Sequence, residues 1–415
     1  MRPVPPGERI LSIDVLRGVA VLGILFVNML WFAQPALYME QAGIRWWTQP
    51  WDLAAEAFIR FAAEGKFITM FSFLFGLGMA IQMRRARRKG VPFAGLYVRR
   101  LLILLVIGLA HGLLLWHGDI LTAYAVLGFA LLLLRHTDSH ALVGWAAVLI
   151  LLPVVLAGVV TGLVALASLT PDGAERMQAA MQEQQEMLVG LVERSVEAYR
   201  HGGYPEALER RARDFTFMWS YFFLWLPPIL GLFLVGLMAG RREVFRRAGE
   251  EQPLLRRITF WGFVVGLPAN ALHAWGTLHG LSGMDGSLLG FALGAVHSVG
   301  APVLAFGYMA GLTLLLTRPR WQKGMAPFAA VGRMAFTNYL AQSLICTTLF
   351  YGYGLGLYGR VGPAAGLALT LGIFALQLAW SPWWLNRFRY GPVEWLWRSL
   401  TYGRLEPFRA SGEEP

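Results

Sequence analysis

The chain has 415 residues, of which 56% are hydrophobic and only 15% are charged. Soluble domains carry about 25% charged residues, so this composition excludes an ordinary soluble enzyme and indicates a membrane protein. The net charge of +11 would suggest nucleic acid binding if its distribution were ignored, but nearly all the excess lies in short loops between apolar runs. The single cysteine, Cys346, excludes an intrachain disulfide.

Apolar runs of about 20 residues recur along the whole chain, the length that crosses a bilayer as a helix. They predict an all-α polytopic membrane protein with about ten transmembrane helices, forming a single transmembrane domain. Basic residues concentrate in the loops 83–90, 241–257 and 317–324 and in the tail 387–415, which predicts that both termini are cytoplasmic. The predicted spans lie near 10–33, 56–82, 94–116, 118–135, 141–169, 215–240, 257–280, 288–317, 326–353 and 362–386.

Two segments outside the spans are predicted to be amphipathic. The segment 170–214 carries six Arg and nine Asp or Glu and is predicted to be extracytoplasmic, either as a lid over an outer cavity or as a solvated connector. The cytoplasmic tail 387–415 places tryptophans among arginines, which favours an interfacial anchoring helix. The alternative for the tail is a role at a cofactor entrance, through Arg387 and Arg389.

The first predicted helix carries Asp14, Arg17 and Asn28 within an apolar run. Because charge inside a bilayer costs several kcal/mol unless it is paired or hydrated, such residues are candidates for function. At about 100° per residue, the three side chains form one polar stripe about 21 Å long. Asp14 and Arg17 are one turn apart and are expected to form an ion pair. The charges also favour a retained helix over a cleaved signal peptide.

The third predicted span carries Arg99 and Arg100 near its cytoplasmic end and His111 eleven residues later. Eleven residues are close to three turns, so Arg100 and His111 share a face about 16 Å apart. His117 and Asp119 follow at the outer end, where Asp119 is expected either to cap the next helix or to orient a catalytic histidine. A structural role for His111, bonded to a neighbouring helix, is an equally weighted alternative.

Other polar residues are predicted at membrane depth. Lys66 lies near Glu64, so it either reaches the outer surface or pairs with a buried acid. Three intramembrane histidines raise the question of a metal site, but no HxxxH, HxxE or Cys/His cluster supports one, and we predict no metal. Asn338 and Gln342 are expected either to bond neighbouring helices or to line a cavity. The full set is Lys66, His273, His297, Arg333, Asn338 and Gln342.

Several blocks of the sequence resemble the YeiB-like family, domain of unknown function 418. The blocks are RILSIDVLRGVAVLGILFVN, GKFITMFSFLFGLGMAIQ, IGLAHGLLLWHGDILTAYAVLG and GRMAFTNYLAQSLICTTLFYGYGLGLYG with the tail RFRYGPVEWLWRSLTYGR. That family is more distantly similar to transmembrane acyltransferases such as the lysosomal heparan-alpha-glucosaminide N-acetyltransferase. The shared pattern of the first helix matches Arg9, Ser12, Asp14, Arg17, Gly18, Val27 and Asn28.

This resemblance implies a membrane acyltransferase that moves an acyl group from cytosolic acyl-CoA, such as acetyl-CoA, to a hydroxyl or amine acceptor on the outer side. The lysosomal enzyme carries a catalytic histidine in the loop after the matching asparagine, whereas no histidine lies between Asn28 and His111 here. The expected catalytic residues are therefore His111 or His117 as the base, Asp119 as its partner and Asn28 as an oxyanion donor. The expected acyl-CoA ligands are Arg17, Arg99, Arg100 and Arg333.

Buried ionisable residues serve a permeation path equally well, so the alternative function is transport or export of a small metabolite or lipid. A non-catalytic scaffold is disfavoured, because buried charges are costly to retain. The expected location is the bacterial cytoplasmic (inner) membrane, and the expected partners are the lipid bilayer and a small-molecule or glycan acceptor, with no nucleic acid. A homodimer is expected by analogy alone.

Overall fold

The computed structural model of the protein describes residues 9–281 and 287–409. Within these residues the secondary structure is helical, and the only strand-like pairing is one isolated bridge between Phe388 and Arg409. The predicted all-α, polytopic fold class is confirmed. The helices of the bundle are α1 (Leu11–Ala33), α3 (Pro50–Ala62), α4 (Lys66–Arg88), α5 (Ala94–Ala110), α6 (Leu121–Leu133), α7 (Ser139–Ala167), α9 (Tyr204–Arg241), α10 (Gln252–Leu278), α11 (Leu288–Leu315), α14 (Ala335–Phe350) and α15 (Pro363–Leu385).

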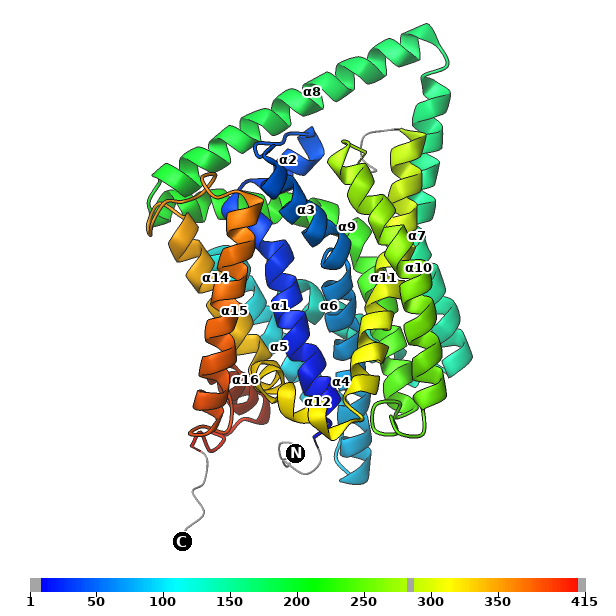
Figure 1. The fold of residues 1–415 in the computed structure, drawn as a ribbon, viewed down its shortest axis with the longest axis vertical. Helices are drawn as coiled ribbons and strands as arrows, with labels where there is room; N and C mark the ends of the chain where they lie inside the picture. Colours follow the sequence, from blue (N-terminus) through cyan, green and yellow to red (C-terminus); the bar gives the residue numbers. More distant parts are fainter. Residues whose placement is uncertain (1–8, 282–286, 410–415) are drawn as a thin grey trace.

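Seven helical stretches of the described chain are long and apolar enough to cross a membrane. One of them, Pro50–Arg88, joins α3 and α4, and a shorter apolar stretch covers Leu121–His136. By length and apolar composition, α10 and α14 are not among these candidate spans, although both run along the bundle in Figure 1. The protein is therefore a multi-pass membrane protein, while the count of ten spans stays a prediction.

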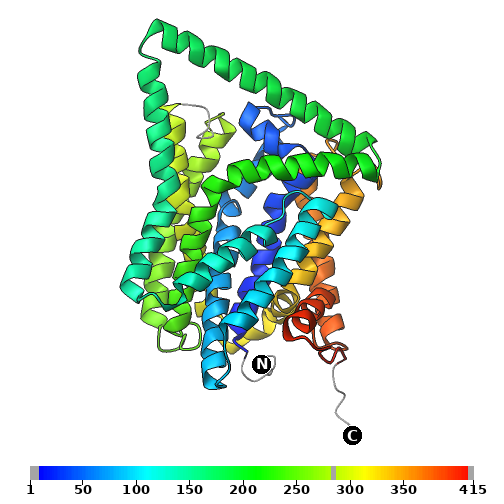
Figure 2. The same cartoon turned by 180° about the vertical axis from the view of Figure 1, so that it is seen from behind.

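The two ends of the helical bundle differ in their covering elements (Figures 1 and 2). At one end, here called the α8 end, α8 (Pro171–Val196) crosses over the bundle, and α2 (Ala36–Ala42) lies beneath it. At the other end, the α16 end, lie α12 (Pro319–Gly324), α13 (Ala326–Arg333) and α16 (Pro392–Tyr402). The start of α1 and the end of α16 lie at this same end.

The sequence of α8 explains its position. Its hydrophobic Leu188 and Val192 are buried in a cluster with Tyr38 of α2 and with Phe215 and Met218 of α9. Most of its other residues are exposed. The second half of α8 is therefore docked on the bundle, while the first half is largely solvated, so the segment combines features of both predicted roles.

Close glycine contacts set the position of α1 at the α16 end. A Cβ added to Gly18 would lie 2.0 Å from the carbonyl oxygen of Phe328, and one added to Gly332 would lie 1.8 Å from that of Asp14. Only glycine at both positions lets α1 and α13 approach so closely. This contact brings Asp14 close to Arg333.

Candidate functional site

The polar residues of α1 have different surroundings. Arg17 Nη1 lies 3.4 Å from Asp14 Oδ1, so these groups form an ion pair at the α16 end. Asn28 is half-buried toward the α8 end, and its amide has no hydrogen-bond partner among the described residues. One turn further on, the ring of Phe32 packs against that of Trp116, with 4.0 Å between centroids. Asn28 therefore lies one turn from Phe32, which contacts Trp116, and it lies outside the hydrogen-bond network of His111.

His111 begins a single π-helical turn, η2 (His111–Leu115), which ends α5. Such turns are rare and frequently occur at functional sites, because they redirect the side chains that follow. Here the turn ends at Trp116, where the backbone becomes extended, and the chain then folds back into α6. This reversal brings the carboxylate of Asp119 back against the ring of His111.

Both ring nitrogens of His111 have hydrogen-bond partners. Nδ1 lies 2.8 Å from Asp119 Oδ1, and Nε2 lies 2.9 Å from the hydroxyl oxygen of Ser343 in α14. The three side chains are buried, with exposed fractions of 4%, 1% and 1% for His111, Asp119 and Ser343. A carboxylate, an imidazole and a hydroxyl joined in this order form the arrangement that activates serine in unrelated enzyme folds.

Asp119 has two roles that the sequence left as alternatives. Its Oδ1 also accepts a hydrogen bond from the backbone N–H of Leu121, at 3.1 Å, and its Oδ2 accepts one from that of Thr122, at 2.8 Å. The carboxylate thus caps the first turn of α6 while it orients His111. A Cβ added to Gly108 would lie 2.5 Å from the nitrogen of Thr122, so glycine is required where α5 meets this turn.

Arg211 of α9 holds the end of η2 in place. Its Nη1 donates to the carbonyl oxygens of Leu113, at 3.3 Å, and Leu114, at 2.5 Å. A cation is stabilised at the carboxyl end of a helix, where unpaired carbonyls gather. The side chain is fully buried, and its Nε and Nη2 have no hydrogen-bond partner among the described residues. Arg211 therefore positions the turn that follows His111.

His117 lies outside the His111 network, although it is close in sequence. Its ring stacks on that of Tyr199, with 6.1 Å between centroids, and its Nδ1 has no hydrogen-bond partner among the described residues. Burial lowers the pKa of His117 to about 4. The structure thus joins Asp119 to His111 and leaves His117 neutral and separate.

A second buried network at the α8 end was not predicted. Asp214 Oδ1 accepts from the hydroxyl of Tyr38 at 2.6 Å and lies 2.7 Å from Arg210 Nη2, while Oδ2 accepts from the hydroxyl of Tyr199 at 2.7 Å. Burial and the neighbouring carboxylate raise the pKa of Tyr38. This network ties α2 and the π turn η4 (Glu197–His201) to α9, so it stabilises the α8 end.

An arginine cluster, defined as Arg17, Arg100 and Arg398, lies at the α16 end. The guanidinium carbon of Arg100 lies 3.6 Å from the ring centroid of Trp397. Arg100 is close enough to Arg17 and Arg398 for mutual electrostatic repulsion. Like charges held together in this way create a positive potential that favours an anion.

The other two predicted acyl-CoA ligands, Arg99 and Arg333, have other neighbours. Arg99 is exposed and points at the end of α16, where a Cβ added to Gly403 would lie 2.9 Å from its Nη1. Arg333 faces Arg9 and Asp14. Sequence reasoning missed Arg398, which is the charged residue with the largest electrostatic effect on Arg100.

Polar residues of α14 and α15 bond the two helices to each other. Gln342 Nε2 donates to Gln377 Oε1 at 2.9 Å, Asn338 Nδ2 donates to Ser381 Oγ at 3.1 Å, and Gln377 Nε2 donates to the carbonyl oxygen of Asn338 at 2.9 Å. The helix-bonding interpretation of Asn338 and Gln342 is therefore confirmed. These bonds fix the rotation of α14 and so the direction of Ser343, which follows Gln342.

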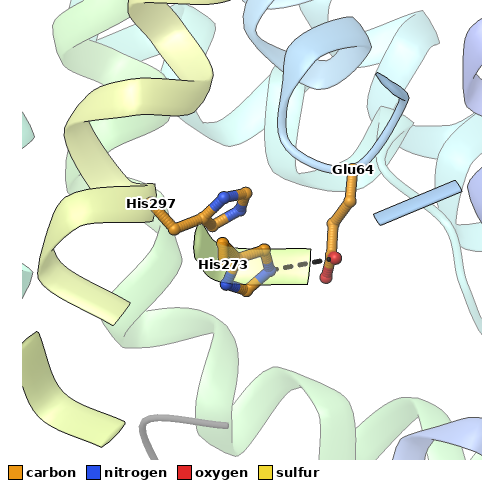
Figure 3. A group of neighbouring side chains, drawn as sticks. All are labelled: Glu64, His273 and His297. Atoms are coloured by element: carbon orange, nitrogen blue, oxygen red, sulfur yellow. Dashed lines mark hydrogen bonds and ion pairs between the residues drawn. The ribbon is translucent and has the colours of Figure 1, made fainter. Parts of the chain in front are cut away.

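A cluster of Glu64, His273 and His297 lies between α10, α11 and the α3–α4 junction (Figure 3). Their potential ligand atoms lie within 4.8 Å of one another, and His273 Nε2 is 3.2 Å from Glu64 Oε2. The two imidazole rings are stacked, with 3.6 Å between centroids. The ring planes are 17° from parallel, so one ion cannot lie in the planes of both rings, as coordination by two imidazoles requires.

Cations surround this cluster. Arg60 Nη1 lies 2.9 Å from Glu64 Oε1, and Arg60 Nη2 lies 2.7 Å from Glu40 Oε1. Lys66, which is fully buried, donates to the carbonyl oxygen of Arg60. Lys66 thus stays inside the protein and does not reach the surface. The neighbouring positive charges favour a network of ion pairs over a divalent cation.

The fold and the polar sites define a helical, multi-pass membrane protein with a buried Ser–His–Asp network. Residues 239–404 match the family model described as a protein of unknown function (DUF418). The chain is 38% identical to the uncharacterized protein YxaH of Bacillus subtilis, covering 98% of both chains. It is 34% identical to the uncharacterized protein YeiB of Escherichia coli, covering 96% of this chain and 98% of that one. The chain therefore belongs to the YeiB-like DUF418 family.

Proposed function

We propose that this protein is a membrane acyltransferase, which moves an acyl group from acyl-CoA to a hydroxyl or amine acceptor at the opposite face of the membrane. The observation that carries the proposal is the engagement of both nitrogens of His111, with Asp119 on one side and a hydroxyl on the other. This arrangement makes the imidazole a base toward a hydroxyl and fixes which nitrogen carries the proton.

The arginine cluster supports the donor side of the proposal. Arg100 precedes His111 by eleven residues on one helix, which is about 16 Å along its axis. Phosphates of acyl-CoA would bind the guanidinium groups of Arg17, Arg100 and Arg398, and its extended arm would carry the thioester toward His111. The α16 end would then face the cytosol and the α8 end the acceptor.

The basic loops support this orientation, because loops rich in Arg and Lys stay on the cytoplasmic side. The loops 83–90, 241–257 and 317–324 all lie at the α16 end. Relatives in Escherichia coli and Bacillus subtilis make the bacterial cytoplasmic (inner) membrane the proposed location. The homodimer expected by analogy stays a prediction.

The proposal is tested with purified, detergent-solubilised protein and acetyl-CoA labelled in its acetyl group. We expect saturable binding and slow release of labelled acetate, lost by at least about 100-fold in His111→Ala. The matched control is His279→Ala, because His279 is exposed and bonded only to its own helix. Wild-type turnover in His111→Ala, with unchanged thermal midpoint, would remove His111 from the mechanism.

One observation favours transport as the second candidate. Glu64, His273, His297 and Lys66 are titratable groups at membrane depth between three helices, as in carriers that move protons or ions. A folded protein that neither binds nor cleaves acetyl-CoA would make transport the better proposal. Substrate accumulation in proteoliposomes under a pH gradient would then be the measurement.

A further inference from the structure

Ser343 stands out among the polar residues of α14, because its hydroxyl is aimed at a histidine. Its Oγ lies 2.9 Å from His111 Nε2. Its other contact, with the carbonyl oxygen of Tyr339 in the same helix, is a long 3.4 Å. The hydroxyl therefore bonds mainly to the imidazole, whereas Thr347, one turn further along, bonds only a carbonyl of its own helix.

We propose that Ser343 is a nucleophile that carries the acyl group as a covalent ester between donor and acceptor. This inference rests on the proposed acyl transfer and deepens it, because it divides the reaction into two half-reactions. The donor is a thioester, and the acceptor is a hydroxyl or amine that arrives after the thiol has left. The two substrates need not occupy the site together.

In the first half-reaction Ser343 Oγ attacks the thioester carbonyl carbon. His111 Nε2 takes the hydroxyl proton, and Asp119 stabilises the resulting imidazolium. The carbon–sulfur bond then breaks, and the leaving thiolate takes the proton from His111. The products are an acyl-serine ester and free thiol, with all protons accounted for and no redox change.

In the second half-reaction the acceptor replaces the thiol. His111 removes a proton from its hydroxyl or amine, which attacks the ester carbonyl carbon. The bond between that carbon and Ser343 Oγ breaks, and His111 returns the proton to the serine. Ser343 is again a free hydroxyl, and His111 is again neutral.

The surroundings suit a covalent intermediate. Trp116 packs beside His111, with 6.3 Å between ring centroids, and its Nε1–H is buried without a hydrogen-bond partner among the described residues. Such a donor can bind the oxyanion that forms in both half-reactions. Because Ser343 is only 1% exposed, water has little access to the ester, which favours transfer over hydrolysis.

The experiment uses two reagents on the purified full-length protein. A fluorophosphonate probe phosphonylates activated serines with loss of fluoride and does not depend on acyl-CoA. Labelled acetyl-CoA, without acceptor, loads the proposed ester. Intact mass and peptide mapping then locate each adduct. We expect both at Ser343, with probe labelling reduced at least 100-fold in His111→Ala.

The variants separate a nucleophile from a hydrogen-bond partner. Ser343→Ala should abolish both adducts, whereas Thr347→Val, which removes a hydroxyl one turn away, should keep them. Ser343→Cys keeps a nucleophile and should accumulate a hydroxylamine-sensitive thioester at the same position, even if the alanine variant folds poorly. Wild-type protein without an adduct at Ser343 from either reagent would overturn the proposal.

Failure of this inference is distinguishable from failure of the proposed function. If Ser343→Ala turns over acetyl-CoA at the wild-type rate while His111→Ala does not, acyl transfer stands and the covalent intermediate is overturned. If the probe labels Ser343 but acetyl-CoA neither binds nor reacts, the nucleophile is supported and the proposed donor is wrong.

Discussion

Two histidine clusters lie inside this molecule, and they differ in burial and in charged neighbours: His111 is buried, whereas Glu64 and His297 of the second cluster are half-buried. His111 contacts one carboxylate and one hydroxyl, and no ion pair to Asp119 from Lys or Arg is present among the described residues. His273 and His297 stack on each other beside Glu64, within reach of Arg60 and Lys66. A histidine that bonds a hydroxyl can act as a general base toward it. Stacked histidines within a network of ion pairs mainly hold helices together.

The largest expected effect is a difference in acyl turnover between variants of Asp119, which contacts His111, and of Glu64, which contacts His273. Asp119→Asn keeps the shape of the side chain but removes the charge that stabilises an imidazolium, so acyl turnover should fall about 10³- to 10⁴-fold. Glu64→Gln should change it less than about 3-fold. Turnover of labelled acetyl-CoA measures both. An equal loss of turnover in the two variants would show that the His111 cluster has no special role in catalysis.

The comparison also shows what the sequence could predict. Asp119 follows His111 by eight residues, so their pairing was within reach of local reasoning. Ser343 lies 232 residues from His111, and only the packing of α14 against η2 brings them together. His273 and His297 were each predicted at membrane depth, but their stacking depends on the rotation of two separate helices.

At the α16 end too, contacts between residues far apart in the sequence could not be predicted. Apolar length and basic loops were sufficient for the fold class, because the bilayer imposes both. Arg398 was missed because the tail was predicted as a surface anchor, whereas α16 is packed against the bundle. Glu394 shows this, since it accepts from the backbone N–H of Phe336 at 2.8 Å and of Thr337 at 3.1 Å at the start of α14.

The next largest effect tests the structural role of the second cluster. Arg60 contacts Glu40, Glu56 and Glu64 with nitrogen–oxygen distances of 2.7, 3.6 and 2.9 Å. Arg60→Met would leave these partly exposed acids without their main partner. The cost should lie above that of an exposed pair, at most about 1 kcal/mol, and below that of a fully buried pair, about 3–5 kcal/mol. We expect a large drop in the thermal midpoint of the purified protein.

The control for that variant is Arg213→Met. Arg213 makes an exposed pair with Glu209, 2.6 Å apart, and such surface pairs contribute at most about 1 kcal/mol. Similar midpoints for the two variants would show that the charges around Glu64 are solvated rather than structural.

Protonation of His117 should limit stability in acid. Its folded-state pKa, about 4, lies below the ordinary value of about 6.5, so the unfolded chain takes up the proton first as the pH falls. The stabilisation is complete above pH 6.5 and is lost toward pH 4, by about 3 kcal/mol in total.

Thermal midpoints measured across this pH range test the assignment. His117→Asn should show a shallower decline between pH 6.5 and 4 than the wild-type protein, whereas the exposed-site variant His279→Asn should follow the wild type. Parallel curves for His117→Asn and wild type would show that another group controls the acid response.

A smaller effect should come from the arginine cluster. Arg398→Ala removes one of three positive groups near Arg100, so the KM for acetyl-CoA should rise about 10-fold, the value of one charge-assisted contact of about 1.4 kcal/mol. The kcat should stay nearly constant, because Arg398 neighbours Arg100, which is about 16 Å from His111 along α5. Arg213→Ala is the control, since Arg213 is exposed and pairs with Glu209 of its own helix. An unchanged KM in Arg398→Ala would place the donor phosphates elsewhere.

The smallest expected effect concerns metal ions at the second cluster. Glu64, His273 and His297 are close enough to hold an ion, but their stacked rings and cationic neighbours oppose one. A ligand at 100 times its dissociation constant stabilises a folded protein by about 2.7 kcal/mol, so tight zinc binding would raise the thermal midpoint clearly. We expect 100 μM zinc to shift it by less than about 1 °C, in the wild type and in His297→Ala alike. A larger shift that only the wild type shows would mean that His297 turns out of the stack to coordinate the ion, and the cluster would then be a metal site rather than an ion-pair network.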